Sequence, residues 1–227
     1  MLKSSPTKPF PSPVQRTFER ASPEMLFRLV CGNPLSTARP GSAANAGITE
    51  AKSTAIVVLT LERLHDVLQL AMGWEDDHLH EFVIGKQRFG EPDPMEEVFG
   101  GPGTASERTA RLFDVLGKAR AKAMYTYDFG DGWGHEIVVE KCLAPEPGRT
   151  YPVCLAGERH GPPEDSGGPH GYYFLLEAIG DPSHKEHEER LDFVGEDFDP
   201  EAFSVDDVNQ RLASLRQRRK KGAAGEK

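Results

Sequence analysis

The residues best suited to chemistry gather in two short segments. The first has two histidines two positions apart, and the second has two aspartates and a histidine around a glycine-rich turn. On a strand, side chains two positions apart project from the same face, so both imidazoles would point to one side. If the two segments are neighbours, imidazole and carboxylate groups would form a ligand set for zinc, manganese or iron. The candidate metal ligands are His78, His80, Asp128, Asp131 and His135.

A structural interpretation of the same residues stays open. Asp128 and Asp131 flank Gly130 at the spacing with which an aspartate hydrogen-bonds its own backbone in a turn. His80 would then be an ordinary, partly buried histidine beside Phe82. We therefore expect no cofactor on the structural interpretation, and a divalent transition metal on the other.

A second dense block, residues 157–171, is rich in glycine and proline. Its Gly167-Gly168 pair precedes an expected helix, whose first amide groups would attract an anion. The block lacks the lysine of a phosphate-binding loop, however, and Glu164 and Asp165 would repel a phosphate. A rigid linker that docks the second half of the chain is the better interpretation.

The elements that must position these residues follow from hydrophobic periodicity. Residues 125–140 alternate on both sides of a turn and predict a β-hairpin with a polar tip, and residues 78–84 predict a strand that turns at 85–90. A helix should begin after Thr60, carry His65 and end at Gly73. Further elements are expected at 55–59, 109–116, 171–179, 182–193 and 205–218. This order predicts an α+β fold, with a mixed or antiparallel sheet containing a hairpin in the first half and packed helices in the second half.

The composition predicts one folded domain between two tails. Residues 1–53 are rich in Pro, Ser and Ala and are expected to be a largely disordered or atypical N-terminal segment. Residues 54–216 should form the domain, because apolar periodicity recurs there, and residues 217–227 form a basic C-terminal tail. The glycines around Trp133 should let its indole fold inward and pack against this domain.

Charge narrows the classes of partner. The net charge is −9, but residues 1–53 carry +4 and residues 211–227 carry +6, which leaves −19 between them. This acidic central segment repels the phosphate backbone of nucleic acids, so nucleic acid would bind only through the basic tails. The sequence has no run of about 18 apolar residues, so no membrane partner is expected. The N-terminus lacks the order of a signal peptide, and we expect a cytoplasmic protein.

Six motifs follow one another in order along the chain. They are Leu61-Glu-Arg-Leu-His-Asp-Val-Leu-Gln-Leu-Ala-Met-Gly-Trp74, Asp77-His-Leu-His-Glu-Phe82, Tyr127-Asp-Phe-Gly-Asp131, Pro162-Pro-Glu-Asp165 with Gly167-Gly168, Gly171-Tyr172 and Phe198-Asp-Pro-Glu-Ala-Phe203. Together they resemble the plasmid pRiA4b ORF-3-like family, which includes insertion-element passenger proteins labelled TnpR. The resemblance spans residues 54–216 and implies a compact α+β domain of plasmids or mobile elements, without a demonstrated reaction. The chain departs from the family pattern in two ways: residues 1–53 lack its first strand and a Pro-x-x-Trp-Arg-Arg segment, and Gly161 and Ser166 stand where some relatives have cysteines.

Three functions stay open at this stage. The first is a non-enzymatic accessory module of a mobile element, which binds an unknown protein partner. The second is a metal-dependent hydrolase in which the histidine and aspartate cluster activates a water molecule. The third is weak nucleic-acid binding through the basic C-terminal tail. Resolvase chemistry is not expected, because Ser166 has only Arg159 nearby in the sequence and residues 205–221 predict one helix where a helix-turn-helix needs two.

Overall fold

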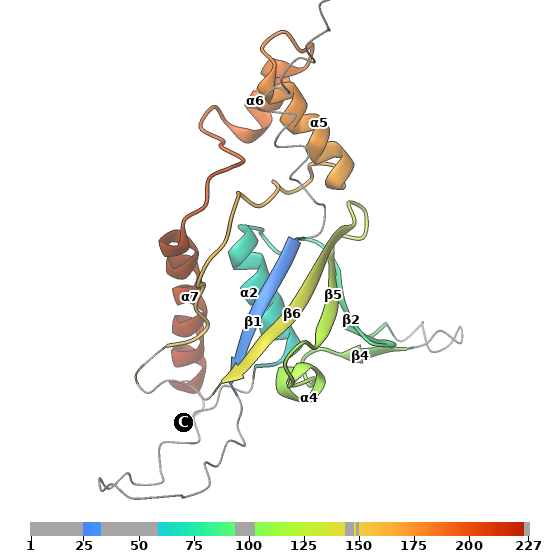
Figure 1. Ribbon diagram of the computed structural model, residues 1–227, viewed down its shortest axis with the longest axis vertical. Coiled ribbons are helices and arrows are strands. Elements are labelled where there is room, and N and C mark those ends of the chain that lie inside the picture. The colour runs from blue at the N-terminus through green and yellow to red at the C-terminus, as the bar shows by residue number, and fades with distance from the viewer. Residues whose placement is uncertain (1–24, 33–58, 94–102, 144–147, 149, 225–227) are drawn as a thin grey trace, which may run out of the picture.

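The computed structural model describes residues 25–32, 59–93, 103–143, 148 and 150–224 (Figure 1). Within these ranges the strands form one sheet in the order β1-β6-β5-β2-β3-β4. The pairs β3–β2, β2–β5 and β5–β6 are antiparallel. The two outer pairs, β1–β6 and β4–β3, are parallel. The strands are β1 (Met25–Gly32), β2 (His80–Ile84), β3 (Gln87–Gly90), β4 (Thr104–Ser106), β5 (Lys122–Tyr127) and β6 (Trp133–Leu143).

The helices complete an α+β fold, as the sequence predicts. Helix α2 begins where the Thr60 side chain accepts a hydrogen bond from the Arg63 amide, at 3.3 Å, and it ends at Gly73, whose φ is 83°. Helix α7 packs against α2, and α5 packs against α6 at the far end of the molecule (Figure 1). The helices are α2 (Leu61–Met72), α4 (Leu112–Leu116), α5 (Gly168–Gly180), α6 (His187–Val194) and α7 (Val205–Ala224).

The two ends of the described chain differ from the sequence prediction. Strand β1 lies inside the N-terminal segment 1–53, so that segment supplies the edge strand that the family pattern requires. Residues 1–24 and 33–58 lie outside the described residues, and with them nearly all of the strand expected at 55–59. Helix α7 continues through Ala224 and includes most of the tail predicted at 217–227. Arginine and lysine are good helix formers, which explains this continuation.

The remaining elements follow the expected order with shifted bounds. The hairpins 80–90 and 122–143 form as expected, and Gly117 ends the short helix α4. Strand β4 was not predicted, because three residues after a Pro/Gly-rich loop give too short a pattern to recognise. Helix α6 begins at His187, five residues later than Pro182 predicts. None of the helices in the described ranges combines the length and the hydropathy that a membrane span requires.

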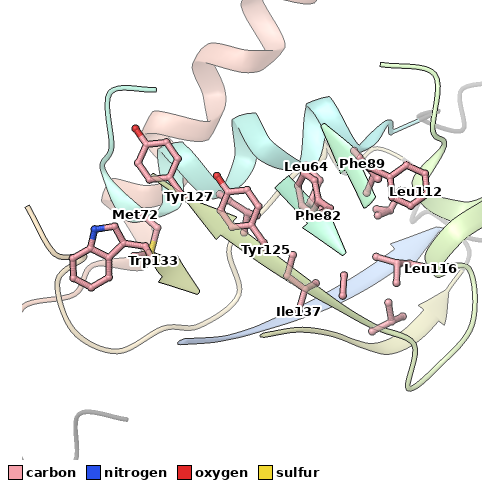
Figure 2. Packing of buried hydrophobic residues seen from close by; sticks show 14 of the residues in the cluster. Leu64, Met72, Phe82, Phe89, Leu112, Leu116, Tyr125, Tyr127, Trp133 and Ile137 are labelled. Carbon is pink, nitrogen blue, oxygen red and sulfur yellow. The ribbon is translucent and has the colours of Figure 1, made fainter. Parts of the chain in front are cut away.

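The core lies between α2 and one face of the sheet. Side chains from alternate positions of β5 and β6 point toward α2, and Figure 2 shows the rings of Tyr125 and Tyr127 on this side of their strand. Trp133 is 5% exposed and is part of the same cluster, which confirms the inward indole. The buried hydrophobic cluster consists of Leu61, Leu64, Leu68, Met72, Trp74, Phe82, Phe89, Leu112, Leu116, Ala123, Tyr125, Tyr127, Trp133, Ile137 and Val139.

The turn between β5 and β6 docks against the start of α5 through Gly168 (Figure 1). Gly168 has φ +67°, and a Cβ there would lie 2.2 Å from the carbonyl oxygen of Asp131. We expect Gly168→Ala to lower the free energy of unfolding by about 2–4 kcal/mol, because backbone strain and a steric clash act together. Gly85→Ala is the matched control, since Gly85 also has a positive φ but faces open space, and it should cost about 1–2 kcal/mol. Equal losses for both variants in urea titrations would show that the contact with Asp131 contributes nothing.

Candidate metal centre

Three loops bring one imidazole and three carboxylates together beside the hairpin tip. His78 precedes β2, Asp128 follows β5, and Glu164 with Asp165 precedes α5. The Nε2 atom of His78 lies 3.2 Å from Asp165 Oδ1 and 3.9 Å from Glu164 Oε2, and its Nδ1 atom lies 3.9 Å from Asp128 Oδ2. We call these four residues the His78 cluster.

Two of the carboxylates are held by one oxygen and present the other to His78. Asp128 Oδ1 accepts a hydrogen bond from the Gly130 amide at 2.8 Å, in the turn that the structural interpretation expects. Glu164 Oε1 accepts from the Tyr127 hydroxyl at 3.0 Å and from the Glu75 amide at 2.9 Å. The atoms facing His78 are the opposite ones, Oδ2 and Oε2. The cluster is therefore positioned by contacts outside it.

Tyr127 is the buried support of this arrangement. It is fully buried, and its ring meets the His78 ring edge-on at 5.9 Å. Burial raises the pKa of the Tyr127 hydroxyl, and the hydrogen bond and charge of Glu164 raise it further. The hydroxyl thus keeps its proton and donates it to Glu164, while it accepts from the Asp77 amide at 3.2 Å.

A second cluster lies deeper, between α2 and the start of β2. The rings of His65 and His80 stack with centroids 3.4 Å apart and planes 5° apart. His65 Nε2 lies 2.6 Å from Asp76 Oδ1, and His80 Nε2 lies 2.8 Å from Glu107 Oε2. We call these four residues the His65–His80 cluster. Burial lowers the pKa of His65, and the charge of His80 lowers it further, against the opposing effect of Asp76.

Both clusters have the composition of a metal site. One ligand atom from each of His78, Asp128 and Asp165 lies within 4.8 Å of the others. The same is true of His65, Asp76 and His80. The side chains of His78 and Asp165 are 30% and 74% exposed, whereas that of His65 is 5% exposed. The His78 cluster is thus the one open to a small molecule.

The structure distributes the five predicted ligands over different places. It brings His78 and Asp128 together, as the metal hypothesis requires. His80 belongs to the other cluster, where its partner is Glu107. Asp131 accepts a hydrogen bond from the Gly167 amide at 3.0 Å, so its carboxylate joins the hairpin tip to the loop before α5.

His135 is not at the hairpin tip, where the sequence placed it. Strand β6 begins at Trp133, so His135 is already within the strand, and alternate positions there face the core. The ring is 1% exposed and lies 5.4 Å from the Trp74 ring and 5.9 Å from the Tyr125 ring. Burial lowers the pKa of His135 to about 4. The structure therefore places His135 in the core among aromatic rings.

Four carboxylates near the histidines were not predicted as ligands. Glu164 and Asp165 belong to the Pro-Pro-Glu-Asp motif, which was interpreted only as a linker. Asp76 follows α2 and lies between the first two family motifs, and Glu107 follows the unpredicted strand β4. One signal in the sequence could have indicated Glu164 and Asp165: acidic or histidine-containing motifs occur in three of the expected loops. For Glu107 the sequence held no such signal.

The fold and these clusters define an α+β domain with histidine and carboxylate groups gathered at one end of its sheet. The chain belongs to the family described as "Plasmid pRiA4b ORF-3-like protein", whose profile matches residues 55–207. It is 42% identical over 159 residues to "Uncharacterized protein y4hQ" of Sinorhizobium fredii (strain NBRC 101917 / NGR234), covering 69% of this chain and 79% of that protein.

A solved structure shows the same fold. The chain resembles the crystal structure of the protein of unknown function MM3350 from Methanosarcina mazei Go1, with 40% sequence identity and a TM-score of 0.58. The match covers 66% of this chain and 83% of that one. These comparisons confirm the family. The TnpR label and the association with mobile elements stay predictions.

Proposed function

We propose that this protein is a divalent-cation-dependent hydrolase with its centre at the His78 cluster. The observation that carries the proposal is the orientation of the carboxylates: Asp128 and Glu164 each have one oxygen fixed by outside donors and the other turned to His78. Metal ligands in proteins are typically oriented in this way by hydrogen bonds from surrounding groups.

Charge balance supports a cation. Three carboxylates surround a single imidazole, and even a protonated His78 would leave two negative charges in a partly buried place. Carboxylates held this close together repel one another, and a bound cation would offset that repulsion. A ligand set of carboxylate oxygens and one imidazole suits Mn²⁺ and similar cations, whereas thiolate ligands select softer metals. We assign His78, Asp128 and Asp165 as ligands.

The exposure of the cluster supports hydrolysis over a closed structural site. Asp165 is 74% exposed on its side chain, which leaves space for water and substrate around a bound cation. A bound divalent cation lowers the pKa of its water, and a nearby carboxylate can take the proton. Glu164 has this position, because Oε2 faces the cluster while Tyr127 holds Oε1.

A non-enzymatic interaction module is the second candidate. Leu79 and Phe129 are large apolar residues, 64% and 53% exposed, and they flank His78 and Asp128 in the sequence. Exposed apolar side chains of this size mark contact surfaces for partners. In this case His78 would join three loops through ion pairs, and the protein partner would cover the hairpin tip. The family description names a plasmid, which supports a role for a plasmid or mobile element. We propose that the protein has this role in the cytoplasm.

Metal analysis and a hydrolysis assay on the full chain test the proposal. We expect about one equivalent of Mn²⁺ per chain and Mn²⁺-dependent hydrolysis of at least one of bis(p-nitrophenyl) phosphate and p-nitrophenyl acetate. Asp165→Asn should weaken Mn²⁺ binding by at least about tenfold and reduce hydrolysis to background, because it removes a ligand charge.

Asp192→Asn in α6 is the matched control, since Asp192 is exposed and lies outside the cluster. It should bind Mn²⁺ and hydrolyse substrate as the wild type does. A folded wild type that binds no Mn²⁺ and hydrolyses neither substrate would contradict the hydrolase, and the interaction module would then be the better assignment.

A further inference from the structure

We propose that His65 and Asp76 are positioning residues for the His78 cluster, and that they act through the loop of residues 74–78. The inference rests on the proposed function, because the cluster that they position is the metal centre assigned above. It is carried by the hydrogen bonds of this loop, which lies between α2 and β2 and ends at His78 itself.

The stacked rings of His65 and His80 indicate that their cluster holds side chains in place and does not bind an ion. The ring planes are 5° apart and the centroids 3.4 Å apart. Nitrogen lone pairs lie in the plane of their ring, so two stacked imidazoles do not point at one ion. Each Nε2 atom lies instead at a different carboxylate, Asp76 at 2.6 Å and Glu107 at 2.8 Å.

A buried chain of hydrogen bonds fixes the side of the His65 ring that faces away from Asp76. The Gln69 amide nitrogen donates to the Tyr125 hydroxyl at 3.0 Å, and this hydroxyl lies 2.8 Å from His65 Nδ1. A carboxylate only accepts, so the Nε2 atom of His65 carries a proton and donates it to Asp76. The His65 side chain is 5% exposed, and its bond to Asp76 therefore ties the loop to the core.

Asp76 has a backbone conformation that needs such a tie. Its φ is 66°, in the left-handed region that few residues other than glycine adopt. Its side chain is 54% exposed, so burial of Asp76 does little to hold the loop. The hydrogen bond from His65 is thus well placed to fix the path of the chain at this position.

The residues on both sides of Asp76 make the bonds that orient Glu164. The Glu75 amide donates to Glu164 Oε1 at 2.9 Å. The Asp77 amide donates to the Tyr127 hydroxyl at 3.2 Å, and this hydroxyl donates to the same Oε1 atom at 3.0 Å. A change in the path of the chain at Asp76 would move both donors, and with them the carboxylate whose other oxygen faces His78.

The two ends of the loop strengthen this dependence. Trp74 Nε1 donates to the Pro162 carbonyl at 2.8 Å, so the loop also holds the segment that carries Glu164 and Asp165. His78 follows Asp77 directly in the chain. The loop therefore positions the imidazole through the backbone and the carboxylates through hydrogen bonds, and the metal affinity should depend on a bond in which neither partner is a ligand.

Two substitutions at position 76 of the full chain test the inference. Asp76→Gly removes the acceptor of the His65 bond but adopts a positive φ readily, so it should fold. It should weaken Mn²⁺ binding, measured by calorimetric titration, by at least about tenfold, as loss of an outer partner of a metal site typically does. Asp76→Asn keeps an acceptor oxygen and tolerates this φ, although it loses the charge, and it should bind Mn²⁺ within about threefold of the wild type.

Hydrogen exchange of the metal-free protein reads the position of the loop directly. The amides of Glu75 and Asp77 should exchange at least about tenfold faster in Asp76→Gly than in the wild type, and at nearly the wild-type rate in Asp76→Asn. Arg120→Gly is the matched control, since Arg120 is exposed, has a positive φ of 67° and precedes β5, whereas the His78 cluster lies where β5 ends. It should change neither Mn²⁺ binding nor these exchange rates.

The possible failures can be told apart. Wild-type Mn²⁺ affinity in Asp76→Gly would overturn the inference, and so would unchanged exchange of the two amides. An equal loss of affinity in Asp76→Asn would overturn it too, because the charge of Asp76 and not its bond to His65 would then be responsible. Each of these results leaves the hydrolase standing. A folded wild type that binds no Mn²⁺ would overturn the hydrolase and this inference together.

Discussion

Trp133→Ala is expected to lower the free energy of unfolding by about 3–5 kcal/mol, the range for a large aromatic removed from a packed core. The Trp133 ring lies 6.3 Å from the Trp74 ring and 6.2 Å, edge-on, from the Tyr172 ring of α5. Trp133 therefore joins the core between α2 and the sheet to the first part of helix α5. Urea titrations at constant temperature measure the loss.

Phe129→Ala is the matched control for this prediction. Phe129 is also a large aromatic of the same hairpin, but it is 53% exposed, so its removal should change the free energy of unfolding by at most about 0.5 kcal/mol. Similar losses for both variants would show that Trp133 contributes no more than a surface ring. Trp133→Phe should recover part of the stability, because it restores much of the buried area.

The fold could be predicted where local signals were strong. The 3.6-residue periodicity of Leu61, Leu64 and Leu68, with Thr60 and Gly73 at the ends, is sufficient to place α2. The alternation around a glycine-rich turn is likewise sufficient for the β5–β6 hairpin. Strand β1 could not be placed in this way, because its pairing with β6 is parallel and joins residues about 110 positions apart in the register.

The candidate site could be predicted only in part, because it is built from loops. His78 and His80 were expected to act together, since both should project from one face of a strand. In the structure β2 begins at His80, and His78 lies in the preceding bend, from which it reaches Asp128 and Asp165. Loop conformations such as the positive φ of 54° at Asp128 have no periodicity to reveal them.

The same limit explains how His135 was misplaced. The three glycines around Trp133 suggested a wide turn, whereas the turn closes early with the Gly132 amide donating to the Asp128 carbonyl at 2.6 Å. Ladder pairing then begins at Trp133 opposite Tyr127. A shift of the turn by two residues keeps the alternation of β6 but moves His135 from the tip to the core.

The buried His135 leads to a large expected effect of pH on stability. Burial lowers its pKa to about 4, against the usual 6.5, so the unfolded chain binds a proton between these values that the folded chain does not. The free energy of unfolding should therefore fall as the pH drops from 6.5 to 4, by up to about 3 kcal/mol from this residue alone. Below pH 4 both states are protonated and the contribution no longer changes. The lowered pKa of His65 acts in the same direction.

Comparison of His135→Phe with the wild type isolates this contribution, because the carboxylates that also titrate in this range are shared by both proteins. Unfolding free energies measured from pH 7 to pH 4 should fall less steeply in the variant, with the difference growing toward pH 4. His170→Ala, at an exposed position of α5, should keep the wild-type slope. If His135→Phe is folded and loses stability with the wild-type pH dependence, the proton uptake belongs to other groups, and His135 is not held neutral by its burial.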